Sequence, residues 1–310
     1  MITTLLLAAQ LASPVAACPT QSAVLVAAAE KVQARYVDPS QAALIAADLR
    51  EWAQDGRYAA SCQDTARFLQ RLNQDLDAHD GHFHVELTAD AANADDWLMQ
   101  WRAAAGPTNA GVREVRVFEG NIGYLRLATF HSWDLAGAKL AHAWGLLKDT
   151  QGLILDLRQN GGGDADTPNR IVRSFLGDDV VAVQDIERRS GSTVDALPAA
   201  SLPPYAGPVA ILVDRRTASA AEFVAYSLQA EKRALVFGAR SAGAAHLMGE
   251  PLAIGQGMQI TIPDGRPVNR RSRGNWERQG VVPDVPGGDD PVFLAREHLR
   301  RVTTPPAAKD

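Results

Sequence analysis

The feature that most constrains the fold of this chain is one short segment, residues 153–164, which reads LILDLRQNGGGD. Four of its first five residues are large and apolar, the pattern of a β-strand that is buried on both faces. Three consecutive glycines then end the run, and glycine lets a loop turn its backbone N–H groups toward a ligand because it has no Cβ. The segment predicts a buried strand that leads into a loop suited to a developing negative charge.

Two other interpretations of this loop are a tight strand-to-helix turn and a phosphate-binding loop. The phosphate loop is disfavoured, because neither a GxxxxGK sequence followed by Ser or Thr nor a GxGxxG sequence is present.

A second buried strand is predicted at residues 209–213, followed by a turn that opens a helix with the sequence RRTASAAEFV. Ser219 falls at the start of this helix, where free N–H groups and the helix dipole favour negative charge. On this segment alone a structural role is favoured over a nucleophile, because Ser219 and Glu222 have the spacing of a capping box and Thr217 could also cap the helix.

Together and in this order, the two segments resemble those of the C-terminal-processing (tail-specific) serine peptidases, which carry a LxLDLRxNxGG strand and loop and a later S-A-S/A-x-E helix start. The likeness runs from about Gly120 to Pro286 and includes the sequences IGYL at 122–125 and GVVPD at 280–284. It implies an α/β protein whose core is the crotonase-like spiral, preceded here by an N-terminal helical bundle.

The resemblance implies that Ser219 is the nucleophile and that the amides of Gly161, Gly162 and Ala220 form the oxyanion hole. Many members of the family use a lysine base in a Gly-Lys-Gly segment. Ala244 stands at that lysine position, so the Ser/Lys dyad cannot form in this chain.

A serine hydroxyl needs a neighbouring base, and the sequence DLDAHDGHFHV at 75–85 resembles the base-bearing segment of the branch that includes the tricorn core protease and interphotoreceptor retinoid-binding protein. By that resemblance His82 is the base and Glu277 supports it. Gly81 replaces the serine that precedes the base in the tricorn enzyme, so Glu277 could reach His82 directly, through water, or not at all. Two alternatives remain open: His246 as the base, and Asp80 as the group that orients His82.

Two further functions remain as alternatives to an exported serine endopeptidase acting on peptides or protein tails. One is a noncatalytic binder of an apolar small molecule, as in the retinoid-binding relatives. The other is a metal-binding protein that uses His79, His82 and His84, with ligands from Asp75, Asp77 or Asp80, although the spacing matches no specific zinc motif and HExxH is absent. The peptidase needs neither a cofactor nor a metal.

Composition fits a peptidase better than a nucleic-acid-binding protein. The 310 residues carry a net charge of −5, which offers no basic surface for nucleic acid. We expect a peptide or protein substrate and no transmembrane span, and the sequence does not determine the oligomeric state. About 25 residues separate His84 from Val112, too few for the PDZ domain that many relatives carry.

The first 17 residues contain no ionisable side chain and end in Val15-Ala16-Ala17, which predicts a signal peptide and export to the periplasm or cell exterior. Cys18 follows directly, so a lipid anchor on Cys18 is one alternative. A disulfide with Cys62 is favoured, because an even pair of cysteines in an oxidising compartment usually forms a bridge. The chain then divides into a helical cap at 18–108, a crotonase-like peptidase domain at 109–302 and a disordered tail at 303–310.

Hydrophobic periodicity predicts the individual elements. Three amphipathic helices are expected at about 20–36, 40–54 and 63–77, and a hairpin of 112–118 and 122–130 turns at Glu119-Gly120-Asn121. Strands and helices then alternate, with helices at 134–148, 166–176 and 219–231 and strands at 152–157, 209–213 and 234–238. If the first three helices run up, down and up, the first and third begin at the same end, which brings Cys18 and Cys62 together.

Overall fold

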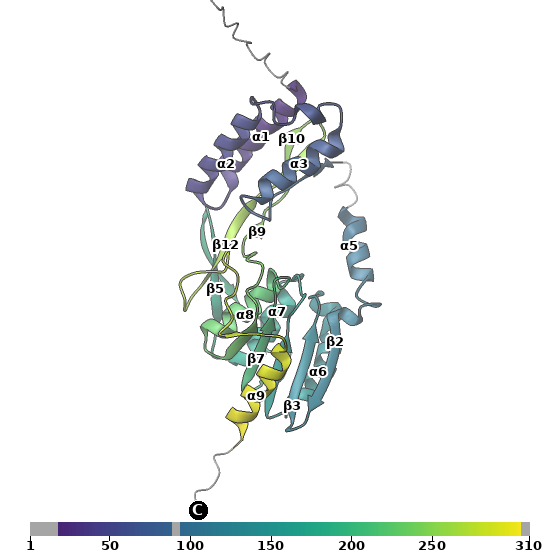
Figure 1. Cartoon of the computed structure of the whole chain (residues 1–310), viewed down its shortest axis with the longest axis vertical. Helices are drawn as coiled ribbons and strands as arrows, with labels where there is room; N and C mark the ends of the chain where they lie inside the picture. The colour runs from purple at the N-terminus through teal and green to yellow at the C-terminus, as the bar shows by residue number, and fades with distance from the viewer. Residues whose placement is uncertain (1–17, 89–93, 305–310) are drawn as a thin grey trace, which may run out of the picture.

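The computed structural model describes residues 18–88 and 94–304, and it is an α/β protein with three sheets. The expected signal peptide and most of the expected tail lie outside these residues. The helices and sheets form two lobes along the long axis of the molecule (Figure 1): α1, α2 and α3 lie at one end and the six-stranded sheet lies at the other, with β5, β12 and β9 between them.

The largest sheet has six strands in the order β13-β8-β7-β4-β3-β2. Their bounds are β2 (Val112–Phe118), β3 (Ile122–Leu127), β4 (Gly152–Asp156), β7 (Val209–Val213), β8 (Ala234–Gly238) and β13 (Val285–Pro286). All neighbours are parallel except the β2–β3 hairpin. The predicted strands at 209–213 and 234–238 are confirmed. Because β4 and β7 are parallel neighbours, the glycine loop and the Ser219 turn leave the sheet at the same edge.

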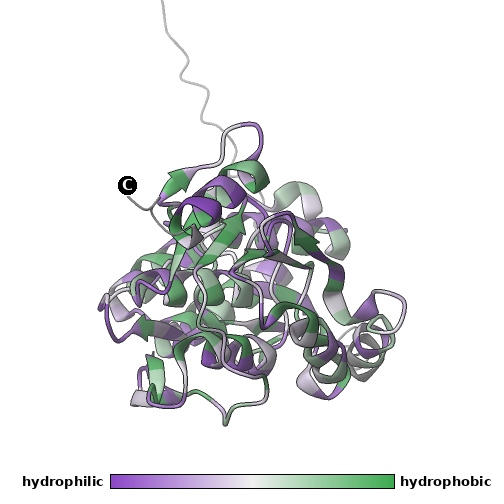
Figure 2. Ribbon diagram, turned by 90° about the horizontal axis from the view of Figure 1, so that it is seen from below, coloured by the Kyte–Doolittle hydropathy of each residue, from purple (hydrophilic) through white to green (hydrophobic). Residues whose placement is uncertain are grey.

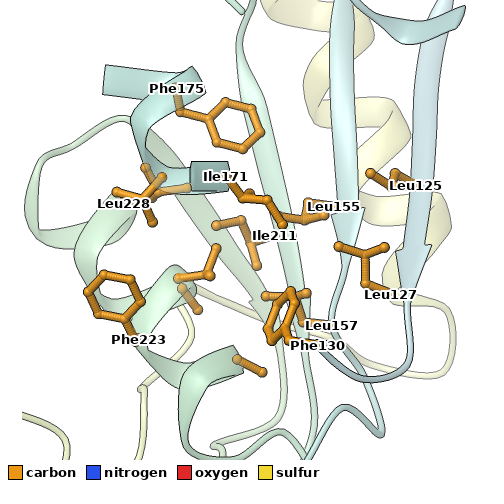
Figure 3. Packing of buried hydrophobic residues seen from close by; sticks show 14 of the residues in the cluster. Leu125, Leu127, Phe130, Leu155, Leu157, Ile171, Phe175, Ile211, Phe223 and Leu228 are labelled. Atoms are coloured by element: carbon orange, nitrogen blue, oxygen red, sulfur yellow. The ribbon is translucent and has the colours of Figure 1, made fainter. Parts of the chain in front are cut away.

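Alternating side chains of β4 and β7 enter two separate cores, which explains the unbroken apolar runs at 153–155 and 209–213. Leu155 and Ile211 face the larger core, together with residues of α6 (Trp133–Leu147), α7 (Asp166–Leu176) and α8 (Ala220–Ala230). Figure 3 shows Leu155, Ile211 and Phe175 within this core. Ile154 and Leu212 face the opposite side, where α9 (Pro291–Thr303) contributes Leu299.

The second sheet has four antiparallel strands in the order β6-β5-β12-β9. Its strands are β5 (Ala182–Arg188), β6 (Gly191–Ala196), β9 (Leu247–Met248) and β12 (Pro263–Asn269). None of these strands was predicted, because their sequences mix polar residues, glycine and proline without a clear period of two.

The N-terminal lobe combines helices with a small sheet. The three predicted helices are present as α1 (Pro19–Arg35), α2 (Pro39–Trp52) and α3 (Thr65–Asp77). They pack against the sheet β1-β11-β10, formed by β1 (His84–Leu87), β10 (Leu252–Gly255) and β11 (Met258–Thr261). The hydrophobic core of this lobe is therefore not formed by residues 18–108 alone, because Ile254 of β10 and Ile260 of β11 are buried in it.

Short elements connect these parts: η1 (Ala59–Ser61), α5 (Ala94–Ala103) and η2 (Asn109–Gly111). Many helices carry both hydrophobic and hydrophilic segments (Figure 2), as expected for helices with one buried face. No helix in the described ranges 18–88 and 94–304 combines the length and the apolar character that crossing a membrane requires.

Cys18 and Cys62 form a disulfide bond, with their Cα atoms 5.5 Å apart. Cys18 is the N-cap of α1, and Cys62 follows η1 shortly before α3 begins. The beginnings of α1 and α3 thus lie at the same end of the lobe, as the up-down-up arrangement predicts.

Candidate active site

The glycine loop and the Ser219 turn are joined to each other by hydrogen bonds. The Thr217 hydroxyl donates to the Leu157 carbonyl at 2.9 Å, and the Ala218 N–H donates to the Asn160 carbonyl at 2.9 Å. Both loops end parallel strands at one sheet edge, so short contacts of this kind can fix their relative position. Ser219 is therefore held at a defined distance from the glycine loop.

Ser219 is the N-cap of α8 and has a left-handed backbone, with φ 52° and ψ −122°. A non-glycine residue with positive φ is uncommon, and such strain persists where the surroundings impose it, often at functional sites. The Glu222 carboxylate accepts the Ser219 N–H at 2.9 Å, which is one half of the predicted capping box. The turn presents Ser219 at the helix N-terminus, where the dipole favours negative charge.

Glu222 also binds the loop that follows β8. Its buried carboxylate accepts hydrogen bonds from the Ser241 hydroxyl at 2.5 Å, from the Gly243 N–H at 2.6 Å and from the Ala244 N–H at 2.8 Å. One side chain thus connects the Ser219 turn to the loop in which many relatives carry lysine. Ala244 occupies that position, so the site has no ammonium group there.

The glycine loop differs in one respect from the expectation. The Gly162 N–H, expected in the oxyanion hole, donates to the Asn160 side-chain oxygen at 2.9 Å. A Cβ on Gly162 would lie 2.8 Å from the Ser219 Cβ, so glycine is required here for close packing. Gly163 has φ 131° and lines the same cavity as Ser219, which the three identical glycines of the sequence do not reveal.

Asp80 joins two histidines from distant parts of the chain. Its Oδ1 lies 2.9 Å from His82 Nδ1, and its Oδ2 lies 2.6 Å from His246 Nδ1. The Tyr36 hydroxyl donates to Oδ2 at 3.0 Å, and the Asp80 side chain is closed to solvent. A carboxylate can only accept, so each imidazole presents Nδ1–H to Asp80 and keeps Nε2 free to act as a base.

These hydrogen bonds set the charge of Asp80 and His82. Burial favours neutral Asp80, but hydrogen bonds from His246 and His82 outweigh it and hold the Asp80 pKa well below its usual range. Burial also opposes the charged form of His82, yet its hydrogen bond to Asp80 and the nearby carboxylate charges raise its pKa above the ordinary 6.5. Burial and the neighbouring Asp80 raise the pKa of Tyr36, which stays a neutral donor.

Glu277 lies beside His246. The hydrogen bond to His82 that the resemblance implies for Glu277 is made by Asp80. The Glu277 carboxylate accepts the Ala245 N–H at 2.7 Å and the His246 N–H at 3.0 Å, and it lies 3.9 Å from His246 Nδ1. The reason is local: Asp80 precedes His82 by two residues, so it accepts both the His82 backbone N–H, at 2.9 Å, and the ring Nδ1–H.

The three histidines proposed for a metal site do not converge. His79 lies 3.3 Å from Asp48, and His84 lies 3.6 Å from Glu86 on β1, while His82 pairs with Asp80. A different group, Asp80, His246 and Glu277, has one ligand atom each within 4.8 Å of one another. A metal ion there would have to displace the proton that His246 shares with Asp80.

One cavity of about 400 Å³ brings the two parts of the site together. It is lined by Ser219 and Ala220 from the start of α8, by Gly163 from the glycine loop, and by His82 and His246. The side chains of His82 and His246 are 14% and 10% exposed, so both imidazoles are largely shielded from bulk water. The cavity therefore combines a strained serine, backbone N–H groups and two imidazoles oriented by one carboxylate.

Curated relatives match part of the chain. It is 32% identical over 196 residues to a chloroplastic C-terminal processing peptidase of Tetradesmus obliquus, covering 59% of this chain and 37% of the relative. It is 29% identical over 200 residues to the chloroplastic carboxyl-terminal-processing peptidase 2 of Arabidopsis thaliana, covering 61% and 37%. The alignments thus span little more than a third of these relatives' length.

Solved structures resemble nearly the whole chain. A lipoprotein from Streptococcus agalactiae superposes with a TM-score of 0.61 at 16% identity, covering 91% of this chain and 97% of that one. The photosystem II D1 C-terminal processing protease superposes with a TM-score of 0.56 at 20% identity, covering 93% and 98%. At these identities the likeness establishes the fold. The profile of Peptidase family S41 matches residues 121–286, more than half of the sequence, and the chain belongs to that family.

Proposed function

We propose that this protein is an exported serine endopeptidase that cleaves peptides or protein tails by acyl transfer. The observation that carries the proposal is one cavity shared by Ser219, on a left-handed turn at a helix N-terminus, and His82, whose Nδ1 is bound by buried Asp80. Membership of Peptidase family S41 supports the reaction class, and the names of the processing peptidases among the relatives support protein tails as substrates.

In the proposed reaction, the Ser219 hydroxyl oxygen attacks the scissile carbonyl carbon and His82 Nε2 takes the hydroxyl proton. The oxyanion that forms is stabilised by backbone N–H groups. We assign this role to Ala220 and Gly163. They replace the expected set of Gly161, Gly162 and Ala220, because the Gly162 N–H is already bound to Asn160 and Gly161 is not among the residues that line the cavity. Each donor of this type contributes roughly 3 kcal/mol in the transition state.

The protonated His82 then gives its proton to the leaving amine, and the C–N bond breaks to leave an ester on Ser219. A water molecule, deprotonated by His82, attacks the ester carbonyl carbon. The C–O bond to Ser219 then breaks, His82 returns the proton to the Ser219 oxygen, and the carboxylic acid product leaves. Asp80 keeps Nδ1 protonated and stabilises the imidazolium that forms in each half of the reaction.

Glu277 and His246 have supporting roles in this proposal. The Glu277 carboxylate accepts the backbone N–H groups of residues 245 and 246 and so fixes that part of the loop. The His246 ring forms a hydrogen bond with Asp80 Oδ2. His246 remains the alternative base, because it shares Asp80 and the cavity with His82. The activities of His82→Ala and His246→Ala distinguish which of the two histidines is the base.

We also propose the domain division and the location. The core at 109–302 is assigned to the crotonase-like spiral, and 18–108 to a cap that is completed by β10 and β11. Export is supported by the apolar first 17 residues with Val15-Ala16-Ala17 and by the Cys18–Cys62 disulfide, since such bonds persist in oxidising compartments.

The test is cleavage of a defined peptide mixture, with products identified by mass spectrometry, by the purified protein and by Ser219→Ala. We expect cleavage by the wild type, none above background by Ser219→Ala, and wild-type rates for Ser190→Ala, which alters an exposed serine in the β5–β6 turn. Cleavage by Ser219→Ala at the wild-type rate would refute the assignment. A wild type that cuts no peptide but binds apolar small molecules in the cavity would favour the noncatalytic alternative.

A further inference from the structure

We propose that the cavity selects a cationic substrate side chain, lysine or arginine, near the scissile bond, with Asp195 as its binding partner. This inference deepens the proposed peptidase function and rests on it. Asp195 lies on β6 of the four-stranded sheet and lines the same cavity as Ser219.

Asp195 is fixed by the strand next to it. Gln184 of β5 is its cross-strand partner, and the Gln184 amide Nε2 donates to Asp195 Oδ2 at 2.7 Å. Gln184 is only 7% exposed and also lines the cavity. This hydrogen bond orients the carboxylate and leaves Oδ1 available to another donor.

The charge of Asp195 is not compensated within the described part of the chain. Its acidic neighbours on β5 are each paired with an arginine: Asp185 with Arg270 at 2.7 Å, and Glu187 with Arg266 at 2.8 Å. Asp195 has no ion pair among the described residues, and none of the described residues that line the cavity is lysine or arginine. An incoming cation would therefore meet an unpaired carboxylate.

Two amide oxygens strengthen the negative character of this region. Gln184 Oε1 and Asn169 Oδ1 are buried and accept no hydrogen bond, and both residues line the cavity. An unpaired carbonyl oxygen keeps its partial negative charge, which buried surroundings screen poorly. Both oxygens therefore favour a positive charge in the cavity, Gln184 Oε1 next to Asp195, and disfavour a second carboxylate, including the terminal carboxylate of a substrate.

The apolar walls of the cavity that Ser219 and Asp195 share suit the stem of a long side chain. Apolar groups of Ile186, Pro267, Leu247 and Trp276 line the cavity. Lysine and arginine bury their methylene stems along such surfaces while the charged end reaches a polar partner. Arginine can also bind a carboxylate through two parallel N–H donors.

The first experiment measures kcat/KM for matched peptides that carry lysine, norleucine or glutamate at one position. A synthetic peptide library first identifies the position at which lysine or arginine is selected. We expect a preference for lysine over norleucine of about tenfold to a hundredfold, as for a charge-assisted hydrogen bond, and a still lower value for glutamate. The preference should fall with added salt, because screening weakens charge pairs.

The variant that tests the partner is Asp195→Asn, with Asp185→Asn as its control. Both changes remove one carboxylate from the same hairpin, but Asp185 pairs with Arg270 and does not line the cavity. Asp195→Asn should reduce the lysine-to-norleucine ratio to about one, whereas Asp185→Asn should keep the wild-type ratio. Equal ratios in both variants, or no preference in the wild type, overturn the inference.

A binding measurement separates this inference from the peptidase proposal. Ser219→Ala binds without turnover, so calorimetry on that variant reports the affinity for the lysine and norleucine peptides directly. We expect tighter binding of the lysine peptide by at least about tenfold, lost when Asp195→Asn is added. Cleavage without this difference refutes only the role of Asp195. If the wild type cleaves no peptide but the lysine peptide still binds more tightly, only the peptidase proposal is refuted.

Discussion

The Asp80 carboxylate lies 2.9 Å from His82 Nδ1 in a turn that also binds the His82 backbone N–H. Asp80 should therefore fix the tautomer and orientation of the catalytic base. We predict that Asp80→Asn lowers kcat/KM by a hundredfold or more, of the order seen when the acid of a triad is made neutral. Asp48→Asn, which alters the exposed partner of His79, serves as the control. Retention of most of the activity in Asp80→Asn would argue against this role.

The pH dependence should follow the raised pKa of His82. The base must be neutral to accept a proton, so kcat/KM should rise with pH and reach half its plateau above pH 6.5. Because Asp80 raises this pKa while burial lowers it, Asp80→Asn should move the acid limb to lower pH. A His82 pKa that is higher in the folded than in the unfolded protein stabilises the folded state at low pH. This stabilisation is lost as the pH rises through the folded-state pKa of His82. An unmoved acid limb would assign the titration to another group.

The two histidines on Asp80 should differ in their effect on catalysis. We expect His82→Ala to lower turnover about as much as Ser219→Ala, with little further loss in the double variant, because groups that act together are not additive. His246→Ala should be milder, and His84→Ala, at an exposed position, should have little effect. If His246→Ala silences the enzyme and His82→Ala does not, the base is His246. A reversible loss of activity with EDTA would instead point to a metal at Asp80, His246 and Glu277.

Glu222 should be essential for the geometry of the Ser219 turn. Its buried carboxylate accepts four hydrogen bonds, whereas the amide of Glu222→Gln has one oxygen and brings an NH₂ group toward N–H donors. We predict a loss of about 2–4 kcal/mol in the free energy of unfolding and a strong loss of kcat, measured by denaturant unfolding and peptide cleavage. The surface change Glu297→Gln, in an exposed pair with Arg300, should cost at most about 1 kcal/mol. Equal stabilities would contradict the role of Glu222.

The Cys18–Cys62 bond should stabilise the N-terminal lobe. The two residues are 44 apart in sequence, and a closed loop of that size stabilises a fold by about 4 kcal/mol through loop-closure entropy. Reduction should therefore lower the melting temperature, and also the activity, because His82 follows α3 in the same lobe. Intact mass spectrometry of the protein from its native envelope decides the chemistry. Two free thiols, or a diacylglyceryl group on Cys18, would exclude the bridge.

The sequence predicted those parts of the fold whose signal is local. The strand at 209–213 is an unbroken apolar run because both of its faces are buried, and α7 matches its predicted range of 166–176. The strands β5, β6 and β12 carry polar residues and Pro267, so their pairing depends on contacts that no local period reveals. The N-terminal core depends on Ile254 and Ile260, which are distant in sequence from the helices that they cover.

The candidate site likewise combines residues with a local sequence signal and residues whose role depends on long-range contacts. Ser219 and His82 could be selected from motifs, and the structure places both on one cavity. The contact of His246 with Asp80 joins residues 166 apart, so the sequence could offer each only as an alternative. The use of the Gly162 N–H by Asn160 depends on the path of the loop backbone, which three identical glycines do not specify.

The most direct test of the account is reaction of the purified protein with a fluorophosphonate serine probe, followed by peptide mapping. We predict one label per chain, on Ser219, absent in Ser219→Ala and formed far more slowly in His82→Ala, with a labelling rate that rises with pH through the raised His82 pKa. Labelling of a different serine, or peptide cleavage by a protein in which Ser219 never reacts, would contradict the account.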